Sequence, residues 1–120
     1  MPNTMHYGLT EIELKTIVEY LSRHSEVEEA VLFGSRAIGS YKKASDIDIA
    51  IKGTQVTPFT AAALKSELEE ETVIPYFFDI VSYRQLTHRE FIRHIDSCGV
   101  SIYKRQQRNK DIQVEKWLKS

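Results

Sequence analysis

The chain has 120 residues, of which 42% are hydrophobic and 28% charged, and its formal net charge at pH 7 is −1. This length and composition predict one globular domain and leave no room for a second, substrate-binding domain. The near-neutral charge gives no reason to expect a membrane surface or direct nucleic-acid binding. The sequence shows no signal-peptide pattern and no long apolar run, and the single cysteine suits a reducing compartment, so a cytoplasmic location is expected.

The first half of the chain predicts a helix and two strands. A capping-box pattern at Thr10 predicts a helix that reaches about Ser25. The apolar run EAVLF, residues 29–33, is typical of a buried strand. Residues 34–45 are small and polar and predict a loop that has room for one helical turn. Residues 46–51 alternate between isoleucines and acidic or small residues, which predicts a strand with one apolar face.

The second half predicts two more helices and a third strand. The Thr-Pro pair that opens residues 57–71 supplies a cap and a first-turn proline for a helix. Residues 76–82 predict a strand, and Thr87 begins a second capping-box pattern for a helix that stops at Gly99. Residues 100–103 predict a short extended segment.

This order of elements predicts an α/β domain of the α+β type, with a small mixed sheet of three or more strands flanked by helices. Residues 1–103 are expected to form this domain. Residues 104–120 form a basic tail with six lysines and arginines against two acidic residues. A helix from about Asn109 and a frayed, solvated terminus are both compatible with the tail.

Three acidic residues interrupt predicted strands. Asp46 and Asp48 are two residues apart, so their Cα atoms should lie ~6–7 Å apart and point to one face. Asp79 lies between apolar residues of the third strand. If this strand lies beside the second, the three carboxylates converge, and two of them ~5 Å apart repel by about 3 kcal/mol. Such a cluster favours a bound Mg²⁺ or Mn²⁺, although each acid taken singly also fits a solvated strand edge.

A phosphate-binding turn is the second part of the pattern. Gly34 and Ser35 end the first strand, where glycine permits close backbone approach and the serine hydroxyl can bind phosphate. Arg36 follows, and either a phosphate contact or a surface salt bridge suits it equally well. Together with Asp46 and Asp48, the turn predicts one site for metal and triphosphate.

The segment GSRAIGSYKKASDID resembles the Gly-Ser-x10-Asp-x-Asp signature of the DNA polymerase beta-like nucleotidyltransferase superfamily. The small size resembles its minimal nucleotidyltransferase (MNT) group, the antitoxin half of HEPN/MNT pairs. The resemblance covers about residues 10–103 and is most specific over residues 33–49 and 77–81. It leaves the basic tail without an assigned role.

The resemblance implies a role for each residue of the pattern. Gly34 and Ser35 would bind the nucleotide phosphates, and Asp46, Asp48 and Asp79 would hold two Mg²⁺ ions, with Asp79 helping to deprotonate the acceptor. The implied reaction is transfer of AMP from ATP to a tyrosine of a HEPN toxin, with which the chain would form a hetero-oligomer. Two alternatives stay open: a non-catalytic, nucleotide-binding antitoxin and a small-molecule nucleotidyltransferase.

The remaining reactive residues show no pattern of a second site. The four histidines have no ligand spacing and are expected at the surface; they are His6, His24, His88 and His94. Cys98 is expected to be a small, half-buried residue without nucleophilic partners.

Overall fold

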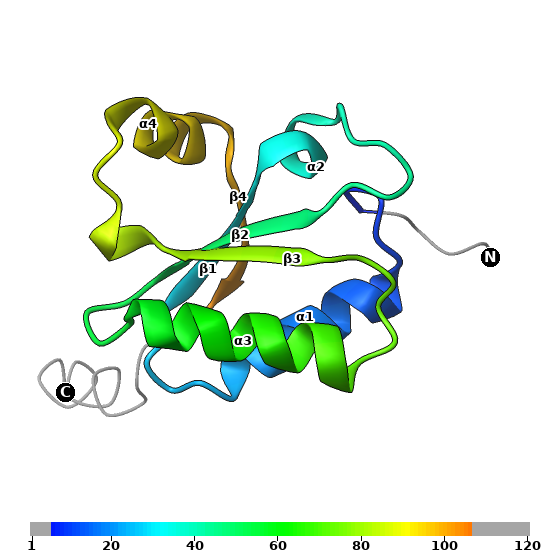
Figure 1. Cartoon of the computed structure of the whole chain (residues 1–120), viewed down its shortest axis with the longest axis horizontal. Coiled ribbons are helices and arrows are strands. Elements are labelled where there is room, and N and C mark those ends of the chain that lie inside the picture. The colour runs from blue at the N-terminus through cyan, green and yellow to red at the C-terminus, as the bar shows by residue number, and fades with distance from the viewer. Residues whose placement is uncertain (1–5, 107–120) are drawn as a thin grey trace, which may run out of the picture.

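The computed structural model describes residues 6–106, which form helices, one sheet and short connections (Figure 1). The elements in chain order are α1 (Glu11–Ser22), β1 (Glu29–Phe33), α2 (Gly34–Ile38), β2 (Ile47–Lys52), α3 (Pro58–Glu71), β3 (Phe78–Ser82), the 3-10 helix η1 (Tyr83–Gln85), α4 (Arg89–Cys98) and β4 (Val100–Lys104). The predicted α/β class and mixed sheet are confirmed. None of the helices in the described range has the length and hydropathy needed to span a membrane.

The sheet has the strand order β3-β2-β1-β4. Strand β1 runs antiparallel to both of its neighbours, β2 and β4, whereas β2 and β3 run parallel. The C-terminal end of β1 therefore meets the N-terminal ends of β2 and β3 at one edge of the sheet. This edge brings together three segments that lie far apart along the chain.

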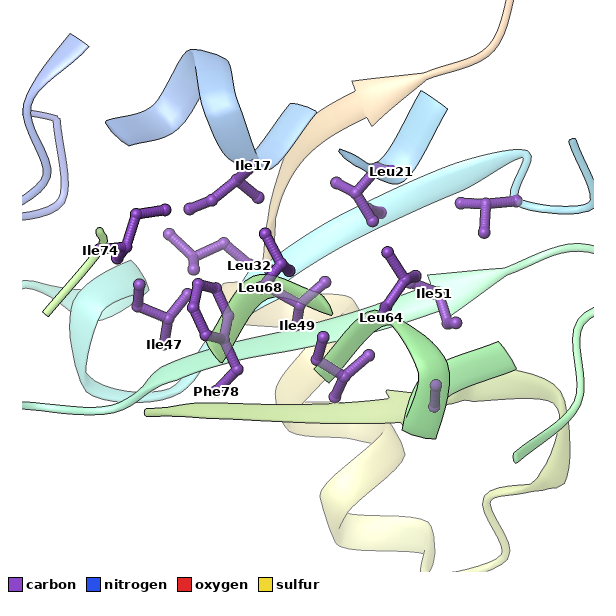
Figure 2. Close-up of a cluster of buried hydrophobic side chains, with 14 of the residues drawn as sticks. Ile17, Leu21, Leu32, Ile47, Ile49, Ile51, Leu64, Leu68, Ile74 and Phe78 are labelled. Atoms are coloured by element: carbon purple, nitrogen blue, oxygen red, sulfur yellow. The ribbon is translucent and has the colours of Figure 1, made fainter. Parts of the chain in front are cut away.

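Two hydrophobic layers hold the sheet. The larger one lies between the sheet and helices α1 and α3, where alternate residues of β2 meet side chains of both helices (Figure 2). Its fully buried members include Ile17, Leu32, Ile49, Leu64 and Leu68. Burial of each such side chain contributes about 1.5–3 kcal/mol, so this layer is the main source of stability. A smaller cluster packs α4 against the opposite face of the sheet.

The start of α1 follows the prediction, whereas its end differs. The Thr10 hydroxyl accepts a hydrogen bond from the Glu13 N–H at 3.1 Å, and the Glu13 carboxylate accepts one from the Thr10 N–H at 3.0 Å. The helix ends at Ser22 and does not reach Ser25. The Arg105 guanidinium donates to the carbonyls of Ser22 and His24 at 3.0 Å each, which satisfies groups left free at the helix end.

The cap of α4 corrects a second prediction. The N-cap is His88, whose Nδ1 accepts a hydrogen bond from the Phe91 N–H at 3.2 Å, and not Thr87. An imidazole nitrogen fills the place that a threonine oxygen usually takes. The helix stops before Gly99, as expected, where a Cβ would collide with the Ile95 carbonyl and the Val31 side chain.

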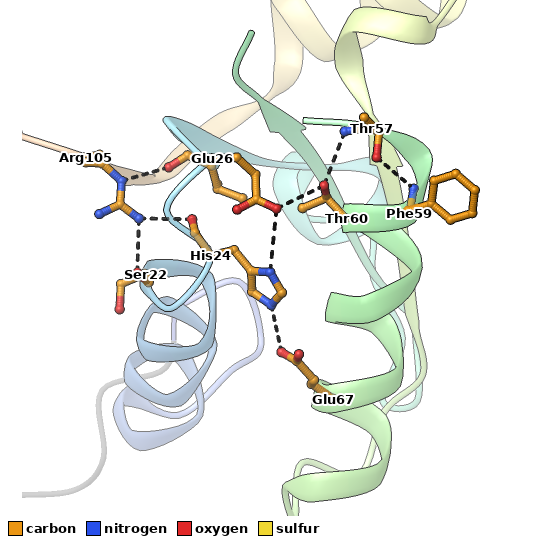
Figure 3. Close-up of polar contacts among 9 residues, drawn as sticks. Ser22, His24, Glu26, Thr57, Phe59, Thr60, Glu67 and Arg105 are labelled. Atoms are coloured by element: carbon orange, nitrogen blue, oxygen red, sulfur yellow. Dashed lines mark hydrogen bonds and ion pairs between the residues drawn. The ribbon is translucent and has the colours of Figure 1, made fainter. Parts of the chain in front are cut away.

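A polar network joins α1, α3 and the segment after β4 at the end of the domain remote from the meeting strand ends (Figure 3). His24 Nε2 lies 2.9 Å from a Glu67 carboxylate oxygen, and the Thr60 hydroxyl donates to Glu26 at 3.2 Å. His24 is largely buried, so its predicted surface position is wrong. Arg105 also belongs to this network, which ties the first residues after β4 to the domain.

Two further predictions concern the end of the chain. Cys98 is exposed, not half-buried as predicted, because it ends α4 on its solvent side. The tail helix predicted from about Asn109 lies outside the described residues, and the division of the chain at residue 103 stays a prediction. Within the described range, β4 continues to Lys104.

Candidate active site

The structure brings two of the predicted acids directly together. Asp48 of β2 and Asp79 of β3 are register partners across the parallel strand pair, in which strands lie ~4.8 Å apart. Asp46 comes immediately before β2, and its charge acts on the Asp48 carboxyl. Asp46 and Asp79 are exposed, whereas Asp48 is half-buried. The sequence left open whether the two acid-bearing strands are neighbours, and the structure pairs them.

Asp48 is the electrostatic centre of this group. Burial, followed by the charges of Asp79 and Asp46, raises the pKa of Asp48 to about 6, while the Arg36 guanidinium acts in the opposite direction. Near neutral pH the charged Asp48 carboxylate is thus poorly solvated and lies close to two other acids. The site therefore attracts a cation, either a proton or a metal ion.

Gly34 lies against the Asp48 carboxylate at the end of β1. Its φ of +75° belongs to the left-handed region, and a Cβ at this position would collide with the Asp48 side chain. Phe33, the residue before it, is the register partner of Asp48. Glycine is thus required twice, for its backbone conformation and for its close approach to the acid. The predicted turn therefore lies directly against one of the predicted carboxylates, that of Asp48.

Ser35 lies in the first turn of the short helix α2. It is half-exposed, and its hydroxyl has no hydrogen-bond partner among residues 6–106. The backbone around it is ordered by the N–H groups of Gly39 and Ser40, which both donate to the Ser35 carbonyl. The hydroxyl is therefore free to bind a ligand oxygen beside Gly34.

Arg36 is buried, with 1% of its surface exposed, so the alternative of a surface salt bridge is wrong. Its guanidinium donates to the Ser45 carbonyl at 2.7 and 3.2 Å and to the Tyr7 carbonyl at 3.0 Å. It also lies 4.4 Å from the ring centroid of Tyr76 and 5.4 Å from that of Tyr41. These contacts fasten the loop that leads to Asp46. A direct phosphate contact by Arg36 stays a proposal, since most of its donors are directed at carbonyls.

An ion pair on α3 holds the strand that carries Asp79. Glu69 accepts the Phe78 N–H at 2.7 Å, and Lys65 donates both to the Phe78 carbonyl at 2.7 Å and to Glu69 at 2.8 Å. At the outer edge of β3 no further strand of residues 6–106 is available to the Phe78 N–H and carbonyl, and the ion pair supplies their hydrogen-bond partners. The Lys65 ammonium and the Phe78 N–H hold the pKa of Glu69 below its usual range.

His94 is a neighbour of the site that the sequence did not reveal. Its Nε2 accepts the Gly34 N–H at 3.2 Å, and its ring packs edge-on against Phe33 with 6.2 Å between centroids. The expectation that His94 is a surface residue is therefore wrong, because it is half-buried against the turn. The spacing of His94 from His88 could not predict this contact, because the contact joins His94 to Gly34, 60 positions away in the sequence.

The acids fit a hard cation, although they do not form a closed cage. Among residues 6–106, no three His, Cys, Asp or Glu side chains already surround a common point. Mg²⁺ usually takes one or two carboxylates and completes its shell with water and substrate phosphates. Oxygen-only donors and the raised pKa of Asp48 match that chemistry.

The site is an open edge of the sheet, not an enclosed cavity. Two large apolar side chains of neighbouring segments are exposed: Phe77, two residues before Asp79, is 71% exposed, and Ile38, at the end of α2, is 55% exposed. A hollow of about 680 Å³ lies at the far end of β1, lined by residues that include Glu28, Lys52 and Arg105. It contains none of the clustered acids, so it is not part of this site.

Comparison with known proteins agrees with this geometry. The family described as polymerase beta, nucleotidyltransferase, matches residues 15–108, and the chain belongs to this family. The resemblance noted in the sequence is thereby confirmed at the level of the superfamily. Members of this family generally use a nucleoside triphosphate and a divalent metal. No curated protein is matched.

Several solved structures share the fold. A toxin–antitoxin structure with AMP-PNP is 21% identical, with a TM-score of 0.65 over 85% of this chain and 82% of that one. The MntA–HepT toxin–antitoxin structure is 18% identical, with a TM-score of 0.61 over 88% and 82% of the two chains. A complex of tri-AMPylated Shewanella oneidensis HEPN toxin with MNT antitoxin is 17% identical, with a TM-score of 0.60 over 87% and 77%. At sequence identities of 17–21%, the structural similarity establishes a shared fold and nothing further.

Proposed function

We propose that this protein is a Mg²⁺-dependent nucleotidyltransferase that transfers AMP from ATP to a tyrosine of a HEPN-type toxin and so acts as its antitoxin. The observation that carries the proposal is the contact between the Gly34 turn and Asp48, which has Asp79 as its register partner. This arrangement unites a turn suited to phosphate with carboxylates suited to metal. The fold neighbours support the choice of acceptor, since they are MNT antitoxins in complexes with HEPN toxins.

Each residue of the site has a role in this reaction. Gly34 lets the backbone of the turn approach the triphosphate closely, the Ser35 hydroxyl binds a phosphate oxygen, and Asp46, Asp48 and Asp79 would hold the two Mg²⁺ ions. Two bound Mg²⁺ ions would supply Lewis-acid stabilisation of the triphosphate and of the attacking oxygen. Asp79 takes the proton of the acceptor hydroxyl.

The bond changes balance without any further reactant. The acceptor oxygen forms a bond to the α-phosphorus, and the bond between that phosphorus and the oxygen bridging to the β-phosphate breaks. Pyrophosphate leaves, and the hydroxyl proton goes to Asp79. The products are an AMP-modified acceptor and pyrophosphate.

The open site supports a protein acceptor over a small molecule. Asp46 and Asp79 are exposed, and Phe77 is 71% exposed two residues before Asp79. A partner protein that covers this edge would exclude water and bring its own hydroxyl to the acids. Aromatic side chains are enriched at protein–protein interfaces, and the exposed Phe77 ring is suited to such a contact.

The test uses ATP labelled at the α-phosphate, Mg²⁺ and the folded product of the adjacent gene. We expect label on a partner tyrosine, loss of transfer with EDTA, and loss of transfer in the D46N/D48N variant. An R23K variant serves as a control because Arg23 is a solvent-exposed residue of the α1 end.

The two alternatives give different results when the activity of the partner is measured together with label transfer. A non-catalytic antitoxin predicts that D46N/D48N still neutralises the partner without any label transfer. A small-molecule nucleotidyltransferase predicts label on a hydroxylated small acceptor and none on the partner. Either result would refute the proposed function.

A further inference from the structure

His94 contacts the phosphate-binding turn from a separate element. The residue lies on α4, and its Nε2 accepts the Gly34 N–H at 3.2 Å. Because Nε2 is the acceptor, the neutral ring carries its proton on Nδ1. The ring also meets Phe33 edge-on, at an interplanar angle of 83°. One side chain thus holds both the last residue of β1 and the first residue of α2.

The bonded peptide is the one whose geometry matters most. Gly34 has a φ of +75° and lies so close to Asp48 that no side chain fits between them. Two elements, α4 through His94 and β2 through Asp48, therefore constrain the same glycine. A change at His94 would free the Gly34 peptide to rotate and would leave its half-buried N–H without a partner.

We infer that His94 is a positioning residue of the nucleotide site, which keeps the Gly34–Ser35 turn in the conformation that receives the triphosphate. The inference rests on the proposed function, because it assigns the turn to phosphate. It goes beyond the carboxylates and the turn, since it adds a histidine from the far end of the domain's sequence to the site.

The packing of α4 does not depend on the His94 nitrogen. Ile95 is 2% exposed and belongs to the cluster beneath the helix, and Phe91 packs edge-on against Phe33 at 5.4 Å. These side chains hold the helix to the sheet. A variant that removes only the acceptor at His94 should therefore fold, and its effect should be confined to the turn.

The experiment compares three variants of α4. H94F keeps a ring against Phe33 and loses the acceptor, whereas H94Q places a carbonyl oxygen near the position of Nε2. S97A is the matched control, because Ser97 is exposed on the same helix. The probes are a fluorescent ATP analogue, with inorganic tripolyphosphate and adenosine as competitors, and amide hydrogen exchange at Gly34.

We expect H94F to bind ATP and tripolyphosphate about fivefold to tenfold more weakly, the loss typical of one hydrogen bond. Adenosine binding should stay unchanged, and Gly34 amide exchange should rise. H94Q should restore phosphate binding to within about twofold of the wild type, and S97A should match the wild type. A merely structural role would weaken adenosine and phosphate binding alike.

Failure of the inference and failure of the proposed function are distinguishable. If the wild type binds ATP and H94F binds it equally well, the inference is overturned and the proposed function stands. If the wild type binds no ATP, the proposed function fails. In that case the amide hydrogen exchange of Gly34 still tests whether His94 holds the turn. An exchange rate that is unchanged in H94F would show that it does not.

Discussion

Asp48 and Asp79 are direct partners across the parallel strands β2 and β3, so two carboxylates meet where a sheet usually places apolar or paired side chains. Burial, then Asp79 and Asp46, raise the pKa of Asp48 to about 6. The folded protein therefore binds a proton at Asp48 more tightly than the unfolded chain does. This contribution to stability is complete below about pH 3.8 and is lost as the pH rises through 6.

The D48N variant removes this charge. At pH 7.5 in EDTA, we expect its free energy of unfolding to exceed that of the wild type by about 1–2 kcal/mol, a value reduced for solvent screening. The difference should disappear near pH 3.5, where the wild-type carboxyl is protonated. Urea titrations at both pH values measure it, with E70Q, at an exposed position, as the control. A D48N variant less stable than the wild type at pH 7.5 would contradict the electrostatic argument.

Gly34 and Gly39 form a matched pair for a second prediction. Both have a positive φ, +75° and +85°, but a Cβ at Gly39 meets nothing within 4 Å, whereas one at Gly34 collides with Asp48. G39A should cost about 1–2 kcal/mol for backbone strain alone. G34A should cost about 1–3 kcal/mol more and should abolish nucleotide transfer. Thermal unfolding measures the loss of stability in each variant, and the transfer assay measures the loss of activity. Equal losses of stability in G34A and G39A would show that a Cβ at Gly34 does not collide with Asp48.

Arg36 should tolerate lysine poorly. A single ammonium group cannot reach both the Ser45 and Tyr7 carbonyls, so R36K should lower the free energy of unfolding by about 2–3 kcal/mol. R23K is the control: it is the same exchange at an exposed arginine 4.2 Å from the Tyr20 ring centroid, and it should cost less than about 0.5 kcal/mol. Chemical denaturation of both variants makes the comparison, and similar losses would show that Arg36 does not fasten its loop.

The ion pair at Phe78 predicts a pH dependence of the opposite sign. Lys65 and the Phe78 N–H hold the pKa of Glu69 below its usual 4.5, so its contribution to stability is present above that pH. The contribution is lost as the pH falls through the lowered folded pKa. E69Q should be about 1 kcal/mol less stable than the wild type at pH 7.

The gap between E69Q and the wild type should close under acid conditions. Urea titrations at pH 7 and below pH 4 provide the measurement, and E70Q again serves as the control because Glu70 is an exposed neighbour on the same helix. If E69Q and E70Q have the same free energy of unfolding at pH 7, the contacts of Glu69 with Lys65 and Phe78 contribute no stability.

Much of the fold was predictable because local patterns repeat with the period of the element they form. The alternation over residues 46–51 predicted an isoleucine face and an acid face, and Ile49 is fully buried while Asp48 borders the site. The capping box at Thr10 likewise predicted the start of α1. Predictions failed where a distant group intervened, as when Arg105 bound the end of that helix.

The candidate site likewise combines features that were predictable from local sequence with contacts that were not. By itself the sequence determined which side chains share a face and where glycine and serine end a strand, because these depend on neighbours one to four positions away. Only the tertiary structure decided that Asp79 is the partner of Asp48, that Arg36 is buried, and that His94 bonds Gly34. The physical reason is that such contacts depend on strand order and helix packing between distant segments, which leave no local periodicity in the chain.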